Sequence, residues 1–417
     1  MKYKAIALLT AVLMIVPAAG CSSRSKTTPD DDIVVIGGKP TTETIETVTP
    51  TEAETEPPTE AEERLHFAAV GDNLIHKAVY RTAENHAENG KDYDFHYCYQ
   101  GVEDTIKKAD LAFINQETVI CNGEFEISGS NLNFNSPNEL GDDLIDIGFD
   151  IVSMANNHVL DKGSSGMRAC LDYWDSQTAK NPELLVLGAY RDYQDMYDYR
   201  ITEVNGIRVG ILAYTDHTNG YSLPGDSEMR IPYLSDKEMI EKQIRELDSQ
   251  VDCVIVSAHW GEEDTHVVRE KDKNLARDMV DWGADVIIGT GPHTLQTMEY
   301  LERGDGTEGF VYYSLGNFIS GQTDNFNMVG GMALFDIVKR DGVTVIESPK
   351  LTPLITQYET GQLQNVRVVP YYDYTDQMVK DHGIPNSPMG HAKSWSWDII
   401  NKIVEDNVPE EFRKLEK

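Results

Sequence analysis

Residues able to bind a metal ion or transfer a proton stand directly after apolar stretches in this sequence. The stretch at 151–155 is apolar and β-branched, as is typical of a strand buried on both faces, and it stops at two amides and a histidine. In sheets of parallel strands, ligands bind at that carboxyl end. The same arrangement recurs over more than half of the chain beyond residue 64. The residues concerned are Asp72, Glu117, Asn157, His158, His259 and His293.

Carboxylate oxygen, amide oxygen and imidazole nitrogen together suit a divalent ion such as Mn, Zn or Fe better than calcium alone. A metal held by them would polarise an ester oxygen and lower the pKa of a bound water molecule, and a neighbouring histidine could protonate the leaving group. Each residue alone has a plainer explanation, since Asp often caps a helix and Asn-Asn suits a turn. Because so many strand ends repeat metal-competent residues, we predict one metal site.

Three further residues allow two interpretations each. Asp161 either caps a helix that begins near Gly163 or takes part in the site. His76 lies one turn after Asp72 and faces either the site or solvent. Trp260 stands beside a site histidine, where it either packs in the core or offers a surface to a substrate.

Apolar stretches of strand length alternate with stretches of helical period, which predicts a mostly parallel sheet covered by helices. Asn205-Gly206 interrupts this alternation and is the strongest signal for a two-residue hairpin. The hairpin divides the pattern into two runs, so we predict an α/β fold with two sheets packed face to face and helices outside. The expected strands are 65–70, 111–114, 151–155, 184–187, 199–204, 207–213, 252–258, 284–288, 310–315, 332–338 and 343–348, and the expected helices are 102–109, 139–147, 163–176, 237–247, 271–282 and 399–405.

The chain is strongly acidic, with 36 Lys and Arg against 70 Asp and Glu and a formal net charge of -34. Such a charge repels nucleic acid and anionic lipid, so we expect no nucleic-acid partner. A surface that binds a polyanion would need a local exception, and no basic cluster along the sequence is large enough to supply one.

The amino terminus resembles a bacterial lipoprotein signal. Lys2 and Lys4 precede an apolar stretch at 5–16 that is too short to span a membrane comfortably, and small residues lead to Cys21. This order predicts cleavage before Cys21 and lipidation of its thiol, which would hold the protein on the extracytoplasmic face of the cell membrane. The alternative is an ordinary secretory signal with an incidental cysteine.

Composition divides the chain into four parts. Residues 1–21 are the predicted signal with its lipidated cysteine, and residues 22–63 are rich in Thr, Glu and Pro, which predicts a solvated tether. Residues 64–353 hold the strand pattern, which Pro349 is expected to close, and residues 354–417 form an appendage or a lid. The remaining cysteines either pair in an oxidising compartment or stay free and buried. They are Cys98, Cys121, Cys170 and Cys253.

One ordered set of motifs runs through the folded part: Val70-Gly71-Asp72, Asn115-Gln116-Glu117, Ala155-Asn156-Asn157-His158 with Asp161 and Gly163, Ala258-His259-Trp260-Gly261, Gly291-Pro292-His293 with Gln296, and Tyr313-Ser314-Leu315-Gly316-Asn317-Phe318. This set resembles the CapA family of poly-γ-glutamate capsule synthesis proteins, which is related to calcineurin-like metallophosphoesterases. The resemblance covers residues 65–350. Its specificity lies in the spacing of the whole set, because any single motif is weak.

The resemblance implies a four-layer αββα sandwich of the metallophosphoesterase type with one or two divalent ions. It implies an extracytoplasmic role in making, exporting or anchoring a γ-linked polyglutamate, with that anionic polymer and membrane proteins of a synthesis complex as partners. The implied metal ligands are Asp72, Glu117, Asn157, His259 and His293, and the implied catalytic residues are His158 as general acid together with Asp72 and Asn157.

The sequence departs from the phosphoesterase pattern in two places. Asp72-Asn73-Leu74 replaces Asp-x-His, and Gly289-Thr290-Gly291-Pro292-His293 replaces Gly-x-His-Pro-His, so each motif lacks one imidazole. Their loss weakens a two-metal site more than it abolishes metal binding. Three functions therefore stay open: a metal-dependent hydrolase of the capsule pathway, a non-catalytic scaffold that binds the polymer or its partners, and an envelope phosphoesterase of another substrate.

Overall fold

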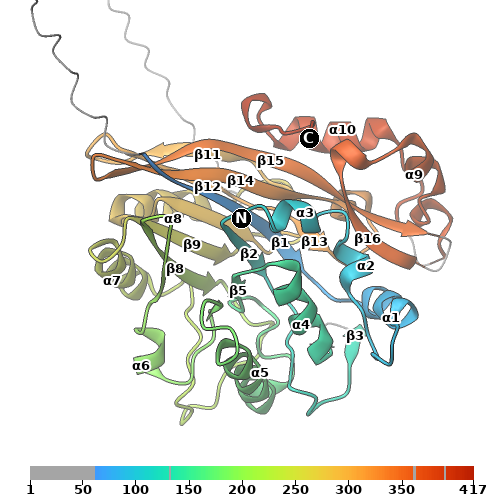
Figure 1. Ribbon diagram of the computed structural model, residues 1–417, viewed down its shortest axis with the longest axis horizontal. Coiled ribbons are helices and arrows are strands. Elements are labelled where there is room, and N and C mark those ends of the chain that lie inside the picture. The colour runs from blue at the N-terminus through green and yellow to red at the C-terminus, as the bar shows by residue number, and fades with distance from the viewer. Residues whose placement is uncertain (1–61, 131–132, 360–362, 389–390) are drawn as a thin grey trace, which may run out of the picture. The chain divides into compact units, whose positions relative to one another are not determined.

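Two β-sheets pack face to face at the centre of the protein, and helices lie against them (Figure 1). The computed structural model describes residues 62–417 apart from 131–132, 360–362 and 389–390. These residues belong to the compact unit Pro58–Lys417. The predicted signal with Cys21 and nearly all of the predicted tether lie outside the described residues.

The first sheet contains eight strands, which are β1 (Glu63–Asn73), β2 (Leu111–Asn115), β5 (Ile151–Ser153), β6 (Leu185–Leu187), β13 (Asn317–Ile319), β14 (Val329–Arg340), β15 (Val343–Glu359) and β16 (Gln364–Pro370). Their order is β16-β15-β14-β1-β2-β5-β6, and β13 pairs with the end of β1. Strands β1, β2, β5 and β6 run parallel. Their carboxyl ends therefore share one edge of the sheet.

The second sheet contains six strands, which are β7 (Arg200–Val204), β8 (Ile207–Thr215), β9 (Cys253–His259), β10 (Val286–Thr290), β11 (Met298–Glu302) and β12 (Glu308–Tyr312). The inner strands β8, β9, β10 and β12 are parallel. The edge strand β7 joins β8 through Asn205 and Gly206, whose φ angles of 53° and 82° suit a tight hairpin turn. The predicted hairpin is confirmed.

Side chains of the second sheet alternate between two cores. On β8, Val209 faces the core shared with the first sheet, whereas Leu212 and Tyr214 face a second core on the outer side. This alternation follows from the two-residue period of a strand buried on both faces. Between the sheets, the Tyr312 hydroxyl donates a hydrogen bond of 3.2 Å to the carbonyl oxygen of Lys350.

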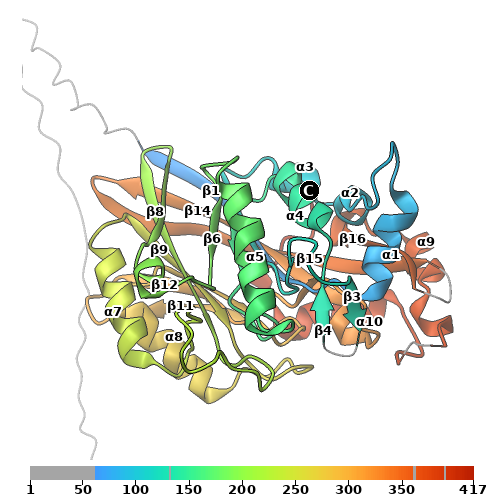
Figure 2. The same cartoon turned by 90° about the horizontal axis from the view of Figure 1, so that it is seen from below.

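The helices are α1 (Lys77–His86), α2 (His96–Tyr99), α3 (Glu103–Ile106), α4 (Asn138–Ile147), α5 (Gly163–Thr178), α6 (Tyr193–Met196), α7 (Lys237–Asp248), α8 (Glu270–Trp282), α9 (Asp376–Asp381) and α10 (Trp397–Asn407). Side chains of α7 and α8 fill the outer core of the second sheet. Helix α5 contacts β6, and α1 and α2 contact β16, so helices of the first half lie against the first sheet (Figure 2). The order helix, sheet, sheet, helix confirms the predicted αββα sandwich.

The expectation that Pro349 ends a strand is wrong, because β15 continues to Glu359. Ser348 and Pro349 together lie opposite the single residue Phe335 of β14, between the pairs Asp336–Glu347 and Leu334–Lys350. This is a β-bulge, where proline is tolerated inside a sheet. The predicted domain boundary after residue 353 falls within β15, and the division into domains stays a prediction.

Two shorter elements also differ from expectation. The helix expected at 102–109 is reduced to α3, and the strand expected at 310–315 ends at Tyr312. The four cysteines of the described region are free and buried. None of the helices in the described region combines the length and apolar character needed to cross a membrane.

Candidate metal centre

The six predicted site residues come together where carboxyl ends of strands from both sheets meet. Asp72 is near the end of β1, Glu117 follows β2, and His259 ends β9. Because these ends converge, Asp72 and His293 become neighbours although 221 positions separate them. The side chains of the whole set are buried, namely Asp72, Glu117, Asn157, His158, His259 and His293.

Glu117 is the centre of this group. Both of its carboxylate oxygens are buried without a hydrogen-bond partner, while the Nε2 atoms of His158, His259 and His293 lie 4.0, 3.9 and 3.8 Å from its Oε1 atom. These distances are too long for hydrogen bonds. Ligand atoms at about 2.0–2.2 Å from one ion lie roughly 3–4 Å from each other. The residues present therefore fit a divalent metal.

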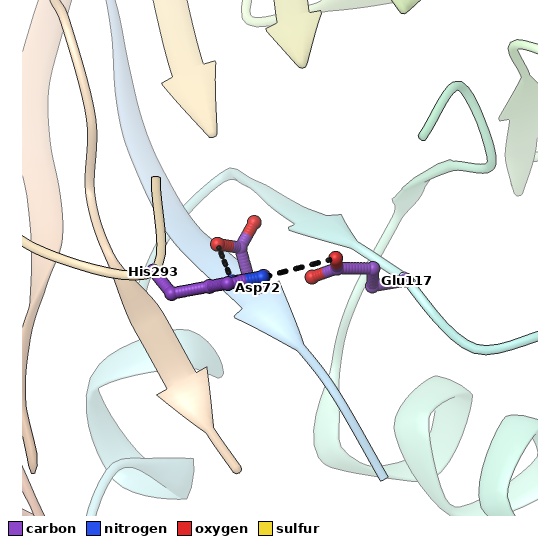
Figure 3. Close-up of side chains that lie close together, drawn as sticks. All are labelled: Asp72, Glu117 and His293. Atoms are coloured by element: carbon purple, nitrogen blue, oxygen red, sulfur yellow. Dashed lines mark hydrogen bonds and ion pairs between the residues drawn. The ribbon is translucent and has the colours of Figure 1, made fainter. Parts of the chain in front are cut away.

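The carboxylate of Asp72 lies next to the ring of His293, on the side away from Glu117, and orients it (Figure 3). The Oδ2 atom of Asp72 is 3.0 Å from Nδ1 of His293, so the other ring nitrogen of His293 points toward Glu117. Asn115 Nδ2 donates to Asp72 at 2.9 Å, and the backbone N–H of Gly291 donates at 3.2 Å. Asp72, Glu117 and His293 bring ligand atoms within 4.8 Å of one another, so Asp72 fits either as a ligand or as the partner that holds His293 in place.

The buried carboxylates leave the site short of positive charge. Burial raises the pKa of Glu117 well above its ordinary value, and the neighbouring charge of Asp72 raises it further. Burial alone would lower the pKa of His293, but the charge of Glu117 and the hydrogen bond to Asp72 raise it to about 10. For Asp72, burial opposes ionisation, but the hydrogen bond and charge of His293 outweigh it and lower the pKa. A divalent cation would displace the proton of His293 and stabilise the ionised form of Glu117.

His259, the last residue of β9, contacts both Asn157 and Thr290, the last residue of β10. Its Nε2 atom is 3.1 Å from the amide oxygen of Asn157, and its Nδ1 atom is 3.1 Å from the hydroxyl of Thr290. Burial lowers the pKa of His259 to about 3, so the ring is neutral at physiological pH. Neutral imidazole is the form that coordinates a metal.

Asp161 fixes the orientation of His158, which answers the question that the sequence left open. Its Oδ2 atom lies 2.8 Å from Nδ1 of His158 and accepts the backbone N–H of Phe134 at 2.7 Å. The residue that precedes α5 is Lys162, and no side chain caps that helix. With Nδ1 bound to Asp161, the Nε2 atom of His158 is directed toward Glu117.

Asn219 is a site neighbour that the sequence analysis missed. It lies in the loop after β8, where its Oδ1 atom accepts a hydrogen bond of 3.3 Å from Asn157 and its Nδ2 atom is 3.4 Å from Nδ1 of His158. The dipeptide Asn219-Gly220 signals a turn, but nothing in that signal links it to a site formed by other strands. Its φ angle of 49° places the residue in the left-handed conformation that such turns adopt.

The two departures from the phosphoesterase pattern have structural explanations. Leu74 stands where the Asp-x-His motif has its histidine, and its apolar side chain is buried, with the backbone N–H donating to the carbonyl oxygen of Ile319 at 3.0 Å. At Gly291 a Cβ atom would lie 2.6 Å from the carbonyl oxygen of Trp260, and the φ angle of 107° disfavours any side chain. A histidine at either position would therefore disturb the present packing.

The remaining ambiguous residues have structural roles. Trp260 is buried and donates from its indole nitrogen to the carbonyl oxygen of Tyr313 at 2.8 Å. His76 accepts the backbone N–H of Gly321 at 3.0 Å and packs edge-on against Phe134, whose other neighbour is the ring of His158. His76 thus supports the wall behind the site.

An αββα sandwich with a buried carboxylate and imidazole centre at its strand ends defines a metallophosphoesterase-like α/β protein. Residues 66–322 match the family described as "Bacterial capsule synthesis protein PGA_cap". This match covers more than half of the chain, so the protein belongs to that family of bacterial capsule synthesis proteins, and the resemblance to CapA is confirmed.

Curated relatives include two proteins named CapA. The chain is 28% identical over 292 residues to "Capsule biosynthesis protein CapA" of Bacillus anthracis, with 68% of this chain and 66% of the relative covered. It is 29% identical over 267 residues to "PGA biosynthesis protein CapA" of Bacillus subtilis (strain 168), with 63% and 65% covered. The chain thus matches slightly less than two thirds of the length of each relative.

Solved structures similar to this chain include two 5'-nucleotidases. One is a 5'-nucleotidase precursor from Thermus thermophilus, with a TM-score of 0.43, 15% identity, and 70% of this chain and 54% of that chain covered. The other is a putative 5'-nucleotidase from Staphylococcus aureus, with a TM-score of 0.43, 18% identity and the same coverage of 70% and 54%.

Proposed function

We propose that this protein is a metal-dependent hydrolase of bacterial capsule polymer synthesis, acting on a phosphoester or an amide bond. One observation carries the proposal: both oxygens of the buried Glu117 carboxylate lack a hydrogen-bond partner, and three imidazole nitrogens face one of them. The names of the two CapA relatives supply the polymer context.

A divalent ion at this site would act as a Lewis acid on the scissile group and lower the pKa of a bound water molecule. Asp72, Glu117 and His293, whose ligand atoms lie within 4.8 Å of one another, would hold it, with His259 and the amide oxygen of Asn157 completing the set. His158 would act as the imidazolium, in which Nδ1–H donates to Asp161 and Nε2–H gives its proton to the leaving group. Asn219, which contacts both Asn157 and His158, would keep these two side chains in register.

Elemental analysis of the purified full-length chain tests the metal centre. We expect a near-stoichiometric transition metal that is lost in His259→Ala and in His293→Ala. His391→Ala is the control, because that side chain is 72% exposed and lies outside the site. A folded wild type that stays metal-free when Mn, Zn and Fe salts are added would overturn the proposal.

Turnover is tested on phosphoesters and on γ-glutamyl amides with the metal-loaded chain. His158→Asn should lose turnover while it keeps its metal and its fold. Preference for a phosphoester with no link to the envelope polymer would assign the same site to an envelope phosphoesterase of another substrate.

A non-catalytic scaffold is the second candidate, and the environment of Asp72 favours it. Gly291 stands where the phosphoesterase motif has a histidine, and its backbone N–H donates a hydrogen bond to the carboxylate of Asp72. Asn115 and His293 also contact this carboxylate. This arrangement favours one ion rather than two. Full restoration of capsule by His158→Asn in a strain that lacks the gene would support the scaffold, whereas failure to restore it would support the enzyme.

We further propose that a lipid on Cys21 anchors the protein to the extracytoplasmic face of the cell membrane, with residues 22–63 as a tether. The signal-like order of residues 1–21 supports this location. Membrane proteins of a capsule synthesis complex and the anionic polymer would then be within reach. Cys21→Ser should abolish labelling by a fatty acid and release the protein from the membrane fraction. A Cys21→Ser variant that stays in the membrane fraction, or a wild type that takes up no fatty-acid label, would contradict the lipid anchor.

A further inference from the structure

A second cavity lies at the other end of β1 from the metal centre. Its volume is about 900 Å³, and its walls come from β1, the region of α3, β14, β15 and the C-terminal segment. Phe67, in the wall, precedes Asp72 by five residues, which corresponds to roughly 17 Å along a strand. Both views place the C-terminus beside α3 (Figures 1 and 2).

The charge of this cavity is opposite to that of the chain. Its lining contains five basic residues and three aspartates, whereas the whole chain has 36 Lys and Arg against 70 Asp and Glu. We call it the basic cavity. Its basic residues are Lys108, Lys350, Arg413, Lys414 and Lys417, and its acidic residues are Asp104, Asp336 and Asp373.

Two of the three aspartates already have cationic partners. Asp336 forms an ion pair of 2.5 Å with Arg64, which lies outside the lining, and Asp373 forms one of 2.8 Å with Lys417. Asp373 and Lys417 compensate one another, whereas Arg64 also pairs with Glu62 and Glu347 and so compensates Asp336 only in part.

Lys417 is thus neutralised by Asp373, but the other four basic residues of the lining keep their charge available. Within the described ranges, no carboxylate lies within ion-pair distance of Lys108, Lys350 or Lys414. Lys350 donates to the backbone carbonyl of Glu411 at 2.5 Å, and Arg413 donates to backbone carbonyls at the end of α10. Carbonyl groups hold these side chains in place without neutralising them.

We propose that the basic cavity binds a run of carboxylates on a flexible anionic polymer, such as a γ-linked polyglutamate. The identity of the polymer rests on the proposed function, whereas anion binding follows from the cavity itself. Lysine ammonium groups on flexible stems can follow successive carboxylates. Leu334, which is half-buried in the cavity wall, offers apolar surface to the methylene groups between those carboxylates. The strongly negative remainder of the protein would repel a long stiff polyanion, but a flexible strand can enter.

Binding of a labelled γ-linked oligoglutamate to the full-length chain at low ionic strength tests this inference. Lys108→Glu combined with Lys414→Glu should weaken binding by roughly tenfold or more, because two attractive contacts become repulsive. The matched control is Lys180→Glu with Lys242→Glu, which changes the net charge equally at exposed positions away from the cavity. The control should bind like the wild type.

Equal weakening in the two double variants would show that only net charge matters and would overturn the inference. Tighter binding of polyphosphate than of oligoglutamate would overturn the assignment of a carboxylate ligand. Metal content separates this inference from the proposed function, since the cavity variants should keep their metal and Glu117→Gln should keep its oligoglutamate binding. Absence of metal-dependent turnover in a wild type that binds oligoglutamate would contradict the proposed function alone. Turnover in a wild type that does not bind oligoglutamate would contradict the inference on the basic cavity alone.

Discussion

The two ends of β1 carry two opposite kinds of charged site. At the carboxyl end, Asp72 and Glu117 are fully buried, and Asp72 is held by Asn115, His293 and Gly291. At the other end, lysines line an open cavity, where Lys350 is held by a backbone carbonyl and Lys417 by an ion pair with Asp373. A buried, rigid centre suits one small ion and chemistry, whereas an open, flexible one suits a polymer. The two sites should therefore respond independently to mutation.

The largest expected effect is the loss of the metal in Glu117→Gln. Removal of the central carboxylate should leave the imidazoles without their shared anionic partner, so metal content should fall to background. An ion at a hundred times its dissociation constant stabilises the native state by about 2.7 kcal/mol, so a chelator should lower the melting temperature of the wild type but not of the variant. Equal chelator sensitivity of the two proteins would contradict a metal centre at Glu117.

Substitution of His158 should separate chemistry from metal binding. A general acid contributes roughly 10²–10⁴-fold to rate, so His158→Asn should lose that factor in kcat with its metal retained. Asp161→Asn should cost less, about tenfold, because the ring remains but loses the partner that orients it. A larger loss of kcat in Asp161→Asn than in His158→Asn would show that His158 is not the general acid.

Gly291 tests whether the backbone itself shapes the metal centre. Gly291→Ala should destabilise the protein by about 1–3 kcal/mol, since the new Cβ atom meets Trp260 at a positive φ angle. Gly304→Ala is the matched control, because a Cβ atom there meets nothing within 4 Å. Denaturant unfolding measures both, and equal stability of the two variants would mean that the turn at Gly291 adapts at no cost.

The smallest expected effect is on the coupling between the two sites. Oligoglutamate binding should weaken steadily as salt rises, because exposed charges are screened over roughly 10 Å at 0.1 M, whereas metal content should stay constant. Combining Glu117→Gln with the Lys108 and Lys414 substitutions should give additive changes in binding free energy within about 0.5 kcal/mol. A larger coupling would mean that the metal centre and the basic cavity act as one site.

Much of the metal centre could be predicted from sequence because each of its ligands follows its own strand. The end of a buried apolar stretch marks a position, and parallel strands bring such positions to one edge. Asn219 could not be predicted in this way, because it belongs to a loop whose path depends on the neighbouring sheet. The role of Asp161 was also ambiguous, since a carboxylate before a helix serves equally well as a cap or as a partner for a nearby histidine.

The fold shows the same division. Asn205-Gly206 specifies its hairpin locally, because both residues tolerate positive φ angles. Pro349 was expected to end a strand because proline has no N–H group to donate to a neighbouring strand. A β-bulge at this position removes the need for that hydrogen bond. The bulge depends on the pairing with β14, which the local sequence does not reveal.

The sequence by itself determined the alternation of strands and helices, the identity of the residues at the strand ends, and the family of capsule synthesis proteins to which they point. These are properties of short stretches whose meaning does not depend on distant partners. Only the tertiary structure decided which oxygens of Glu117 stay without a partner, which imidazoles face them, and where the basic residues gather. The sequence shows no basic cluster because Lys108, Lys350 and Lys414 lie far apart along the chain, and they meet only when the C-terminal segment packs beside β1 and α3.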